Sequence, residues 1–434
     1  MSADALKHNH QPAESAPRWY KLDNAARIYP AIRSRRWSSV FRLSVTLTEP
    51  VQPVLLQQAL GITLRRMPVF AVKMKRGLFW HYFEHGRDKP LVEQDVADPC
   101  VAMASGSQDY LFRVRYYDRR IAVEFFHSLT DGSGGLVFLK TLTAEYLKLC
   151  GYAIPATHGI LDTSADPKAE EAEDSFFRYA NLNMLASRKE ARAYHVPGTR
   201  LPPHRVNVVT GRIPVDRVLA EAKKRGATLT EYLAGAYLYV LFTIQKAEGK
   251  RLRKPVKLSI PVNLRRFFGS ETLRNFSSYV NASIDGRYGD YTFDEVVKHV
   301  HHFLRLEVTD KLLNARLASN VKAQMNPFLR ATPLFVKNWA LFMVFQFVGE
   351  AIFTSTMTNL GAIDVPEEMK PHIQHFDFML GPPRTNRIGC AVASYGGTLS
   401  INFTRTIHEA FVEREFFTFL VRQGIPVKIS SNQE

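Results

Sequence analysis

The stretch His127-Ser128-Leu129-Thr130-Asp131-Gly132 has the pattern HxxxDG, and its surroundings indicate the fold of the whole chain. The run IAVEFF, from Ile121 to Phe126, is rich in β-branched and aromatic residues and predicts a strand directly before the pattern. The run from Gly132 to Cys150 has leucine and tyrosine at helical spacing and predicts a helix directly after it. Because histidine transfers protons near neutral pH, His127 at the end of this strand is a candidate catalytic residue.

Strand and helix patterns alternate on both sides of this motif. In the first half we expect strands or hairpins over residues 40–47, 69–84 and 111–126, and a helix over residues 54–66. In the second half we expect strands over 205–213, 255–262, 276–284, 352–358, 373–380, 387–394, 398–405 and 426–430, and helices over 215–225, 228–246, 294–317 and 409–423. Both halves therefore have the content of an α/β protein, although no residue repeat relates them.

A segment of different composition separates the two halves. Residues 161–174 hold six carboxylates, and prolines follow at 197, 202 and 203. We interpret this segment as a crossover with one helix inside it, over Ser175–Arg192. We therefore expect a flexible tail (1–18), an N-terminal lobe with HxxxDG (19–150), the crossover (151–203) and a C-terminal lobe (204–434).

Composition limits the class of protein. The chain of 434 residues has 46% hydrophobic and 23% charged residues, which is typical of a folded globular protein. Its three cysteines, Cys100, Cys150 and Cys390, are far apart and form neither CxxC nor a zinc-ligand spacing. We therefore expect reduced thiols and a cytoplasmic location. The N-terminal stretch shows no apolar region typical of a secretory signal.

The net charge of +16 suggests an anionic partner. Basic clusters include residues 33–36, 73–76 and 250–254 and the pair Arg265-Arg266. No nucleic-acid recognition motif accompanies them, so nucleic acid is not the expected partner. A phosphorylated cofactor, an acidic carrier protein, a membrane surface and a merely solvated basic surface all remain open.

The most apolar stretch runs from Pro333 to Val348, and Lys337, Asn338 and Gln346 interrupt it. It is too short and too polar for a membrane span. A buried helix is the main interpretation, and a surface helix that touches lipid is the alternative.

Other chemistries lack their patterns. The glycines of Gly132–Gly135 lack the lysine and spacing of a P-loop. His299 and His302 share a predicted helix face without a third ligand, so no metal site is expected. No GxSxG is present, which disfavours a serine hydrolase.

Several segments together resemble the superfamily of chloramphenicol acetyltransferases, condensation domains and plant alcohol acyltransferases. HSLTDG is similar to the active-site motif of these proteins, and residues 64–70 (LRRMPVF) resemble an early "RHPxF" stretch. Residues 261–265 (PVNLR), followed by Arg274-Asn275-Phe276, resemble a "DLR…GN" stretch, and residues 355–361 (STMTNLG) resemble an "SNxG" segment. The resemblance spans roughly residues 20 to 430 and is closest to bacterial alcohol acetyltransferase-like proteins.

Two branches of the superfamily fit less well. The DFGWG motif of the plant branch is not intact, because residues 377–381 read DFMLG. Condensation domains have a second histidine, HHxxxDG, where this chain has Phe126.

The resemblance implies a pseudo-dimer of two similar α/β lobes with a channel at their interface. It also implies that His127 is the general base and that Asp131 pairs with an arginine of the second lobe, for which Arg265 has the matching position. Gly132 would let substrate or backbone pass close by. The Thr358-Asn359 segment is the candidate oxyanion donor.

Each role has a structural alternative. His127 could be a hydrogen-bonded structural residue, Asp131 a helix N-cap, Arg265 a surface arginine, and Asn359 a turn cap before Gly361.

The expected function is therefore an O-acyltransferase of the alcohol acetyltransferase type. It would move an acetyl or short acyl group from acyl-coenzyme A, a co-substrate rather than a tightly bound cofactor, to a small alcohol by direct attack. The basic clusters suit the phosphates of coenzyme A or an acidic acyl carrier protein, and peripheral membrane contact is a further option. The alternatives are a carrier-protein-dependent condensation enzyme that forms esters or amides, and a catalytically silent relative that binds acyl-thioesters or a partner protein.

Overall fold

The structure is a computed structural model that describes residues 19–32, 38–103, 109–184, 190–249, 252–345, 349–382 and 385–433. The tail expected at 1–18 lies outside the described residues, as do the basic residues Arg33, Arg35, Arg36, Lys250 and Arg251.

The first lobe is built on a five-stranded sheet of order β12-β2-β7-β6-β5. Its strands are β2 (Val40–Leu47), β5 (Val92–Gln94), β6 (Phe112–Tyr117), β7 (Arg120–Phe126) and β12 (Ile373–Leu380). Helices α2 (Pro53–Arg66) and α3 (Gly132–Leu149) pack together on one face of this sheet, where alternate residues of β2 (Phe41, Leu43, Val45) join the first core. The period of two in the sequence of β2 thus directs its apolar residues toward the helices.

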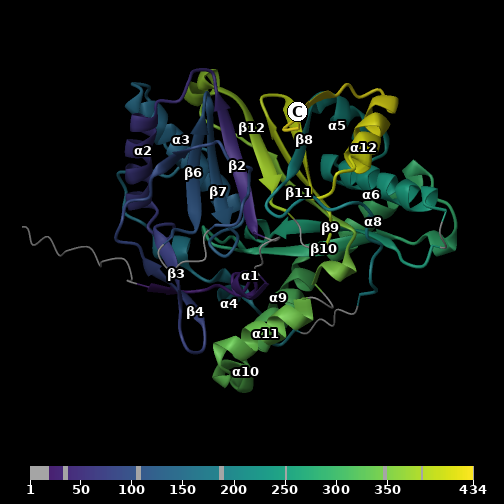
Figure 1. The fold of residues 1–434 in the computed structure, drawn as a ribbon, viewed down its shortest axis with the longest axis horizontal. Helices are drawn as coiled ribbons and strands as arrows, with labels where there is room; N and C mark the ends of the chain where they lie inside the picture. The colour runs from purple at the N-terminus through teal and green to yellow at the C-terminus, as the bar shows by residue number, and fades with distance from the viewer. Residues whose placement is uncertain are drawn as a thin grey trace, which may run out of the picture.

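The second lobe is built on a seven-stranded sheet of order β10-β9-β11-β13-β14-β8-β15. Its strands are β8 (Asn207–Pro214), β9 (Val256–Asn263), β10 (Ser277–Ile284), β11 (Ser355–Ala362), β13 (Ile388–Tyr395), β14 (Thr398–Arg405) and β15 (Lys428–Ser431). Helices α5 (Val215–Lys224), α6 (Leu229–Ala247), α8 (Phe293–Glu307) and α12 (Phe411–Arg422) pack around a second core beside it. Figure 1 shows the two sheets next to each other, each with its own helices.

One strand connects the lobes. β12 belongs to the second half of the chain, yet it pairs antiparallel with β2 at the edge of the first sheet, with Phe378 opposite Leu43. Figure 1 shows β12 between the two groups of strands. The sheets therefore do not follow the sequence ranges of the lobes, and no pattern in the sequence predicted this exchange.

The remaining elements lie at the ends of the lobes. A small sheet of order β1-β4-β3 combines β1 (Trp19–Lys21), β3 (Val72–Arg76) and β4 (His81–His85). The short helices are α1 (Ile28–Ile32), α4 (Ser175–Tyr179), α7 (Arg265–Phe268) and α10 (Pro327–Ala331), and the 3-10 turns are 169–172, 286–288, 350–352 and 367–372. Helices α9 (Asp310–Met325) and α11 (Leu334–Val344) complete the fold, and α10 and α11 project from the lower edge of Figure 1.

Three expectations were wrong. The helix expected over Ser175–Arg192 is only α4, which ends at Tyr179, and residues 185–189 of that range lie outside the described residues. The helix expected over 294–317 is two helices, since Thr309 caps a new helix, α9. The apolar helix expected to be buried is α11, of which only Leu334 is buried.

Within the described ranges, no single helix has both the length and the hydropathy to cross a bilayer. Helices α5 and α6 reach the length and hydropathy of a membrane span only when they are taken together, and an 82° bend separates them. Most of the apolar side chains of α6 are buried in the second core.

Candidate active site

His127 stands in the turn that joins β7 to α3. Its backbone N–H donates to the carbonyl oxygen of Ser39 at 2.8 Å, just before β2, and the N–H of Leu129 closes the turn on Phe126 at 2.8 Å. The hydroxyl of Ser128 donates to the carbonyl oxygen of Ala26 at 3.0 Å, which ties the turn to the segment before α1. The backbone of the turn is therefore fixed from both sides.

Aromatic rings hold the imidazole of His127. The ring of Tyr29, from α1, stacks on it with centroids 4.6 Å apart and an interplanar angle of 13°. The ring of Phe41, from β2, meets it edge-on at 5.2 Å. These contacts restrict rotation of the imidazole about its side-chain bonds.

Asn275 determines which nitrogen of His127 carries the proton. The Nδ2 of Asn275 faces two acceptors, Asp23 Oδ2 at 3.4 Å and the Ser128 carbonyl at 3.3 Å, so its Oδ1 is the atom that faces His127. That Oδ1 lies 3.1 Å from His127 Nδ1 and accepts a hydrogen bond from its N–H group. We assign the Nδ1–H tautomer on this network, which leaves the lone pair of Nε2 available as a base.

Burial lowers the pKa of His127 below its ordinary value of 6.5, because it disfavours the imidazolium ion. The carboxylates of Asp131 and Asp23 and the hydrogen bonds to Asn275 and to the backbone of His127 oppose this shift in part. His127 is thus neutral at pH 7, and nearby negative charges stabilise the cation that proton uptake would form.

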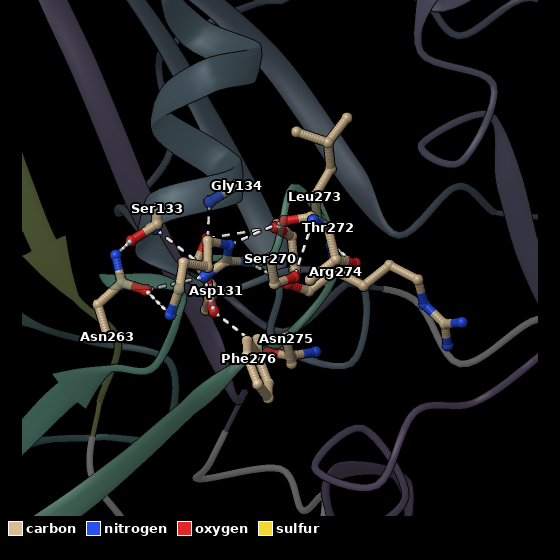
Figure 2. Close-up of polar contacts among 12 residues, drawn as sticks. Asp131, Ser133, Gly134, Asn263, Ser270, Thr272, Leu273, Arg274, Asn275 and Phe276 are labelled. Atoms are coloured by element: carbon tan, nitrogen blue, oxygen red, sulfur yellow. Dashed lines mark hydrogen bonds and ion pairs between the residues drawn. The ribbon is translucent and has the colours of Figure 1, made fainter. Parts of the chain in front are cut away.

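Asp131 links the two lobes and does not point at His127. Its Oδ1 accepts the N–H groups of Ser133 and Gly134, each at 3.1 Å, and so caps α3. Its Oδ2 accepts from Arg265 Nη1 and from the N–H of Phe276, both at 2.8 Å. Asp131 is therefore both the N-cap and the ion-pair partner, so the two interpretations of its sequence position hold together. Figure 2 shows it between α3 and the second lobe.

Electrostatics favour the ionised form of Asp131. Burial raises the pKa of Asp131. The guanidinium of Arg265 and the N–H donors of Phe276 and Gly134 lower it by more than burial raises it, so the net shift is downward. Asp131 therefore keeps its negative charge in the neutral range.

The guanidinium of Arg265 makes its hydrogen bonds within the protein. Besides Asp131, its guanidinium donates to the carbonyl oxygen of Thr272 at 2.8 Å, to that of Arg274, and to Asn263 Oδ1 at 3.3 Å. Arg265 thus fixes the loop that carries Asn275 and is not available for phosphate, which corrects its assignment to a basic donor-binding cluster. Lys250 and Arg251 of the other cluster lie outside the described residues.

The glycine that permits the closest approach is Gly134 rather than Gly132. A Cβ on Gly134 would stand 2.1 Å from the carbonyl oxygen of Leu273, the same oxygen that Thr130 Oγ1 bonds at 2.6 Å. A Cβ on Gly132 would meet the side chains of Leu360 at 3.1 Å and Phe378 at 3.4 Å. The first turn of α3 therefore needs glycine in order to lie against the backbone of the second lobe (Figure 2).

Asn359 takes the turn-capping arrangement. Its Oδ1 accepts the N–H of Gly361 at 2.8 Å, where the backbone has φ +80°, and its Nδ2 donates to Thr230 Oγ1 at 3.0 Å. Thr358 is partly buried in β11 opposite Ala391. Leu360, the neighbour of Asn359, lies against Gly132, so this strand borders the motif.

Tyr29 and Asp23 had no expected role from the sequence, and Asn275 was expected only as part of a segment that resembles the superfamily. A role for Asn275 could have been expected from the sequence, because it directly follows Arg274, whose carbonyl oxygen accepts from Arg265. Tyr29 had no signal, since its five-residue helix has no strong pattern.

Protein-family models and curated proteins gave no match to this chain. Solved structures do match. Polyketide synthase associated protein 5 from Mycobacterium tuberculosis has a TM-score of 0.57 at 14% identity, over 92% of this chain and 97% of that one. F. sporotrichioides TRI101, solved with coenzyme A and T-2, has a TM-score of 0.63 at 10% identity, over 95% of this chain and 99% of that one.

A third solved structure comes from another group. The starter condensation domain of rhizomide synthetase RzmA, solved as a mutant in complex with C8-CoA, has a TM-score of 0.60 at 14% identity, over 93% of this chain and 94% of that one. At these identities the likeness is one of fold. The chain therefore has the two-lobed fold that TRI101 and the RzmA condensation domain share, which agrees with the fold that the sequence resemblance implied.

Proposed function

We propose that this chain is an acyltransferase that moves an acyl group from acyl-coenzyme A to a hydroxyl group, with His127 as general base. The observation that carries the proposal is the held, neutral imidazole: Asn275 accepts from Nδ1, and Nε2 keeps its lone pair. The fold shared with TRI101, which was solved with coenzyme A, supports the choice of donor.

The reaction needs no covalent enzyme intermediate. The acceptor oxygen attacks the thioester carbonyl carbon while His127 Nε2 takes the hydroxyl proton. The tetrahedral intermediate then collapses, the carbon–sulfur bond breaks, and the imidazolium returns the proton to the leaving thiolate. The products are an ester and free coenzyme A, so atoms and charge balance.

Two further roles belong to this proposal. The oxyanion of the intermediate needs a donor, and Thr358 is the better candidate because both ends of the Asn359 amide already have partners. Asp131 and Arg265 contact neither substrate; they hold the loop of Asn275 against the turn of His127, at the interface channel that we expect between the lobes.

The finer specificity is an acetyl or short acyl donor and an uncharged alcohol acceptor. A hydroxyl is hardly ionised at neutral pH, so it benefits most from a base at the moment of attack. The carrier-dependent condensation enzyme is the second candidate, favoured by the likeness to the RzmA domain. Phe126, in the place of the second histidine of that branch, favours the first candidate.

One assay separates these alternatives. Release of free thiol is followed with acyl-coenzyme A of increasing chain length, against alcohol and amine acceptors, and against the same acyl group on dephosphorylated pantetheine. We expect ester formation, a preference for the coenzyme A donor, and weaker donor binding as salt rises. Equal rates with both donors would remove the phosphate argument. Amide formation without ester would overturn the acceptor class, and the absence of any turnover would favour the silent relative.

A further inference from the structure

Helices α10 and α11 and the turn between β3 and β4 form one projecting unit. The N–H of Leu334 donates to the carbonyl oxygen of Leu78 at 2.9 Å. The ammonium of Lys337 donates to the carbonyl oxygens of Phe79 and Arg330, at 2.9 and 3.0 Å. Figure 1 shows the turn and the two helices together at the lower edge of the molecule.

This unit exposes an unusual set of large apolar side chains. Phe328 is 84% exposed, and Phe335 and Trp339 are each 65% exposed. We call the following set the apolar tip: Leu78, Trp80, Phe328, Leu329, Phe335 and Trp339. Apolar groups gathered in this way are uncommon on a surface that faces only water, and they mark a site of contact with another phase or molecule.

The chain segment that carries α10 and α11 has charges of one sign, whereas Glu84 on β4 lies beside Lys75, and Arg316 of that segment pairs with Glu307 of α8. Between Asp310 and Glu350 the chain has no carboxylate, but it carries five basic residues: Lys311, Arg316, Lys322, Arg330 and Lys337. Arg330 is exposed on α10, and Arg76 is exposed at the end of β3, beside the turn of the tip. Aromatic residues flanked by lysine and arginine are typical of segments at the interface of an anionic bilayer.

We propose that the apolar tip docks this protein on the surface of a lipid bilayer that contains anionic lipid. The tip is carried by helices and a turn that project from the fold, and such an element can enter a soft interface without a matching pocket. The aromatic side chains enter the headgroup region, and the exposed side chains of Arg76 and Arg330 contact lipid phosphates. α11, with eleven residues, lies along the interface and is too short to span it.

The position of the apolar tip suggests that docking brings the candidate base close to acceptors in the membrane, an inference that rests on the proposed function. α11 packs against α1, and α1 carries Tyr29, whose ring stacks on His127. The helix that meets the bilayer is thus one layer from the candidate base. The acceptor class that fits is a lipophilic alcohol dissolved in the membrane.

The binding test uses the whole chain and vesicles of phosphatidylcholine, with and without phosphatidylglycerol. The tip variant is Phe328→Ser with Trp339→Ser. The matched control is Tyr288→Ser with Leu306→Ser, whose side chains are 82% and 70% exposed outside the tip. We expect the wild type and the control to sediment with anionic vesicles, and the tip variant to lose at least about tenfold in affinity. Equal binding by the tip and control variants would overturn the proposal.

Two further measurements test whether an anionic bilayer, rather than a second copy of the chain, covers the apolar tip. Arg76→Gln with Arg330→Gln weakens binding to anionic vesicles and reduces its salt dependence. In the wild type, Trp80 and Trp339 are two of four tryptophans, so their emission shifts to the blue on vesicle addition and brominated lipid quenches it. No shift and no vesicle binding, with a dimer by light scattering that the tip variant abolishes, would show that a second copy covers the tip.

Activity distinguishes this proposal from the proposed function. The tip variant keeps its turnover of a short water-soluble alcohol and loses turnover of a long-chain alcohol presented in vesicles. If neither alcohol is acylated by the wild type while vesicle binding stands, the docking surface holds and the proposed function fails. If the tip variant acylates the vesicle-bound alcohol as well as the control does, the link to the substrate is wrong.

Discussion

The two lobes contain equivalent strand–loop–helix units that do different things. In the first lobe β7 leads through residues 127–131 into α3, and in the second lobe β14 leads through residues 406–410 into α12. The neighbours match as well: β2 and β6 pair antiparallel with β7, and β8 and β13 pair antiparallel with β14. The two halves thus repeat a topology that their sequences do not show.

The loops differ in where their polar groups find partners. Thr130, Asp131 and His127 of the first loop bond to the second lobe, at Leu273, Arg265 and Asn275. In the second unit Arg405 pairs with Glu413 of its own helix α12. The N–H groups of Thr406 and His408 donate to Arg387 and Thr199. Both lobes thus have the same strand–loop–helix topology. Only the loop of the first lobe becomes a candidate site, because its polar groups bond to residues of the other lobe.

The largest expected effect comes from removing the base. His127→Ala should lower turnover at least about 10²-fold with the fold intact, since a general base contributes that much or more. The matched control is His408→Ala, an exposed histidine in the equivalent loop of the second lobe, which should keep near wild-type rates. Thiol release and circular dichroism of both variants check this. A folded His127→Ala that turns over at the wild-type rate would show that His127 is not the base.

The ion pairs of the two units sharpen the comparison in stability. Asp131→Asn and Arg265→Gln should each destabilise the protein by several kcal/mol, because one buried charge loses its partner. The losses in the double variant should be strongly non-additive, and activity should fall with stability. Urea unfolding and initial rates provide both measurements. Additive losses would mean that the two residues are not energetic partners.

The equivalent pair in the second lobe is the control. Arg405→Met and Glu413→Gln should also destabilise, since both side chains are almost fully buried. At a temperature where the variants are folded, however, their turnover should stay near that of the wild type, because this pair holds only its own lobe. A loss of turnover as large as that of Asp131→Asn would show that the Arg405–Glu413 pair also supports the candidate site, which would contradict the difference between the two units.

Asn275 should have a smaller, positioning effect. Asn275→Ala removes the acceptor that fixes Nδ1–H of His127, so kcat should fall about tenfold while KM changes little. The hydrogen bond to Asn275 raises the pKa of His127, so its loss should move the acid limb of the rate profile to lower pH. Asn275→Asp should move that limb the other way, since an added carboxylate stabilises the imidazolium. An unchanged pH profile in both variants would contradict the role.

The smallest effect is the position of the wild-type acid limb. His127 must be neutral to act, and burial lowers its pKa, so activity should persist as pH falls to 6.5 and decline only below it. The pH dependence of kcat/KM at constant ionic strength measures this limb. A limb clearly above pH 6.5 would mean that the nearby carboxylates outweigh burial.

Much of the local structure could be predicted from the sequence. The predicted bounds of β2, β12 and β14 agree with the structure, and the capping box of Thr228 and Glu231 begins α6 as expected. The pairing of Asp131 with Arg265 came from a resemblance, and the two residues do form an ion pair. These features depend on period, caps and motif, all of which lie within short windows of the chain.

The strand–histidine–helix motif and the alternating elements could be predicted from the amino-acid sequence, because each depends on near neighbours, and the basic surplus follows from composition. The partner of β12, the exposure of α11, and the placement of Tyr29 and Asn275 against His127 depend on long-range packing and became known only from the folded structure. His127 and Asn275 are 148 residues apart, so no local pattern links them. An apolar helix has the same sequence whether it is buried or exposed, and only the packing of the other elements determines which surface remains uncovered.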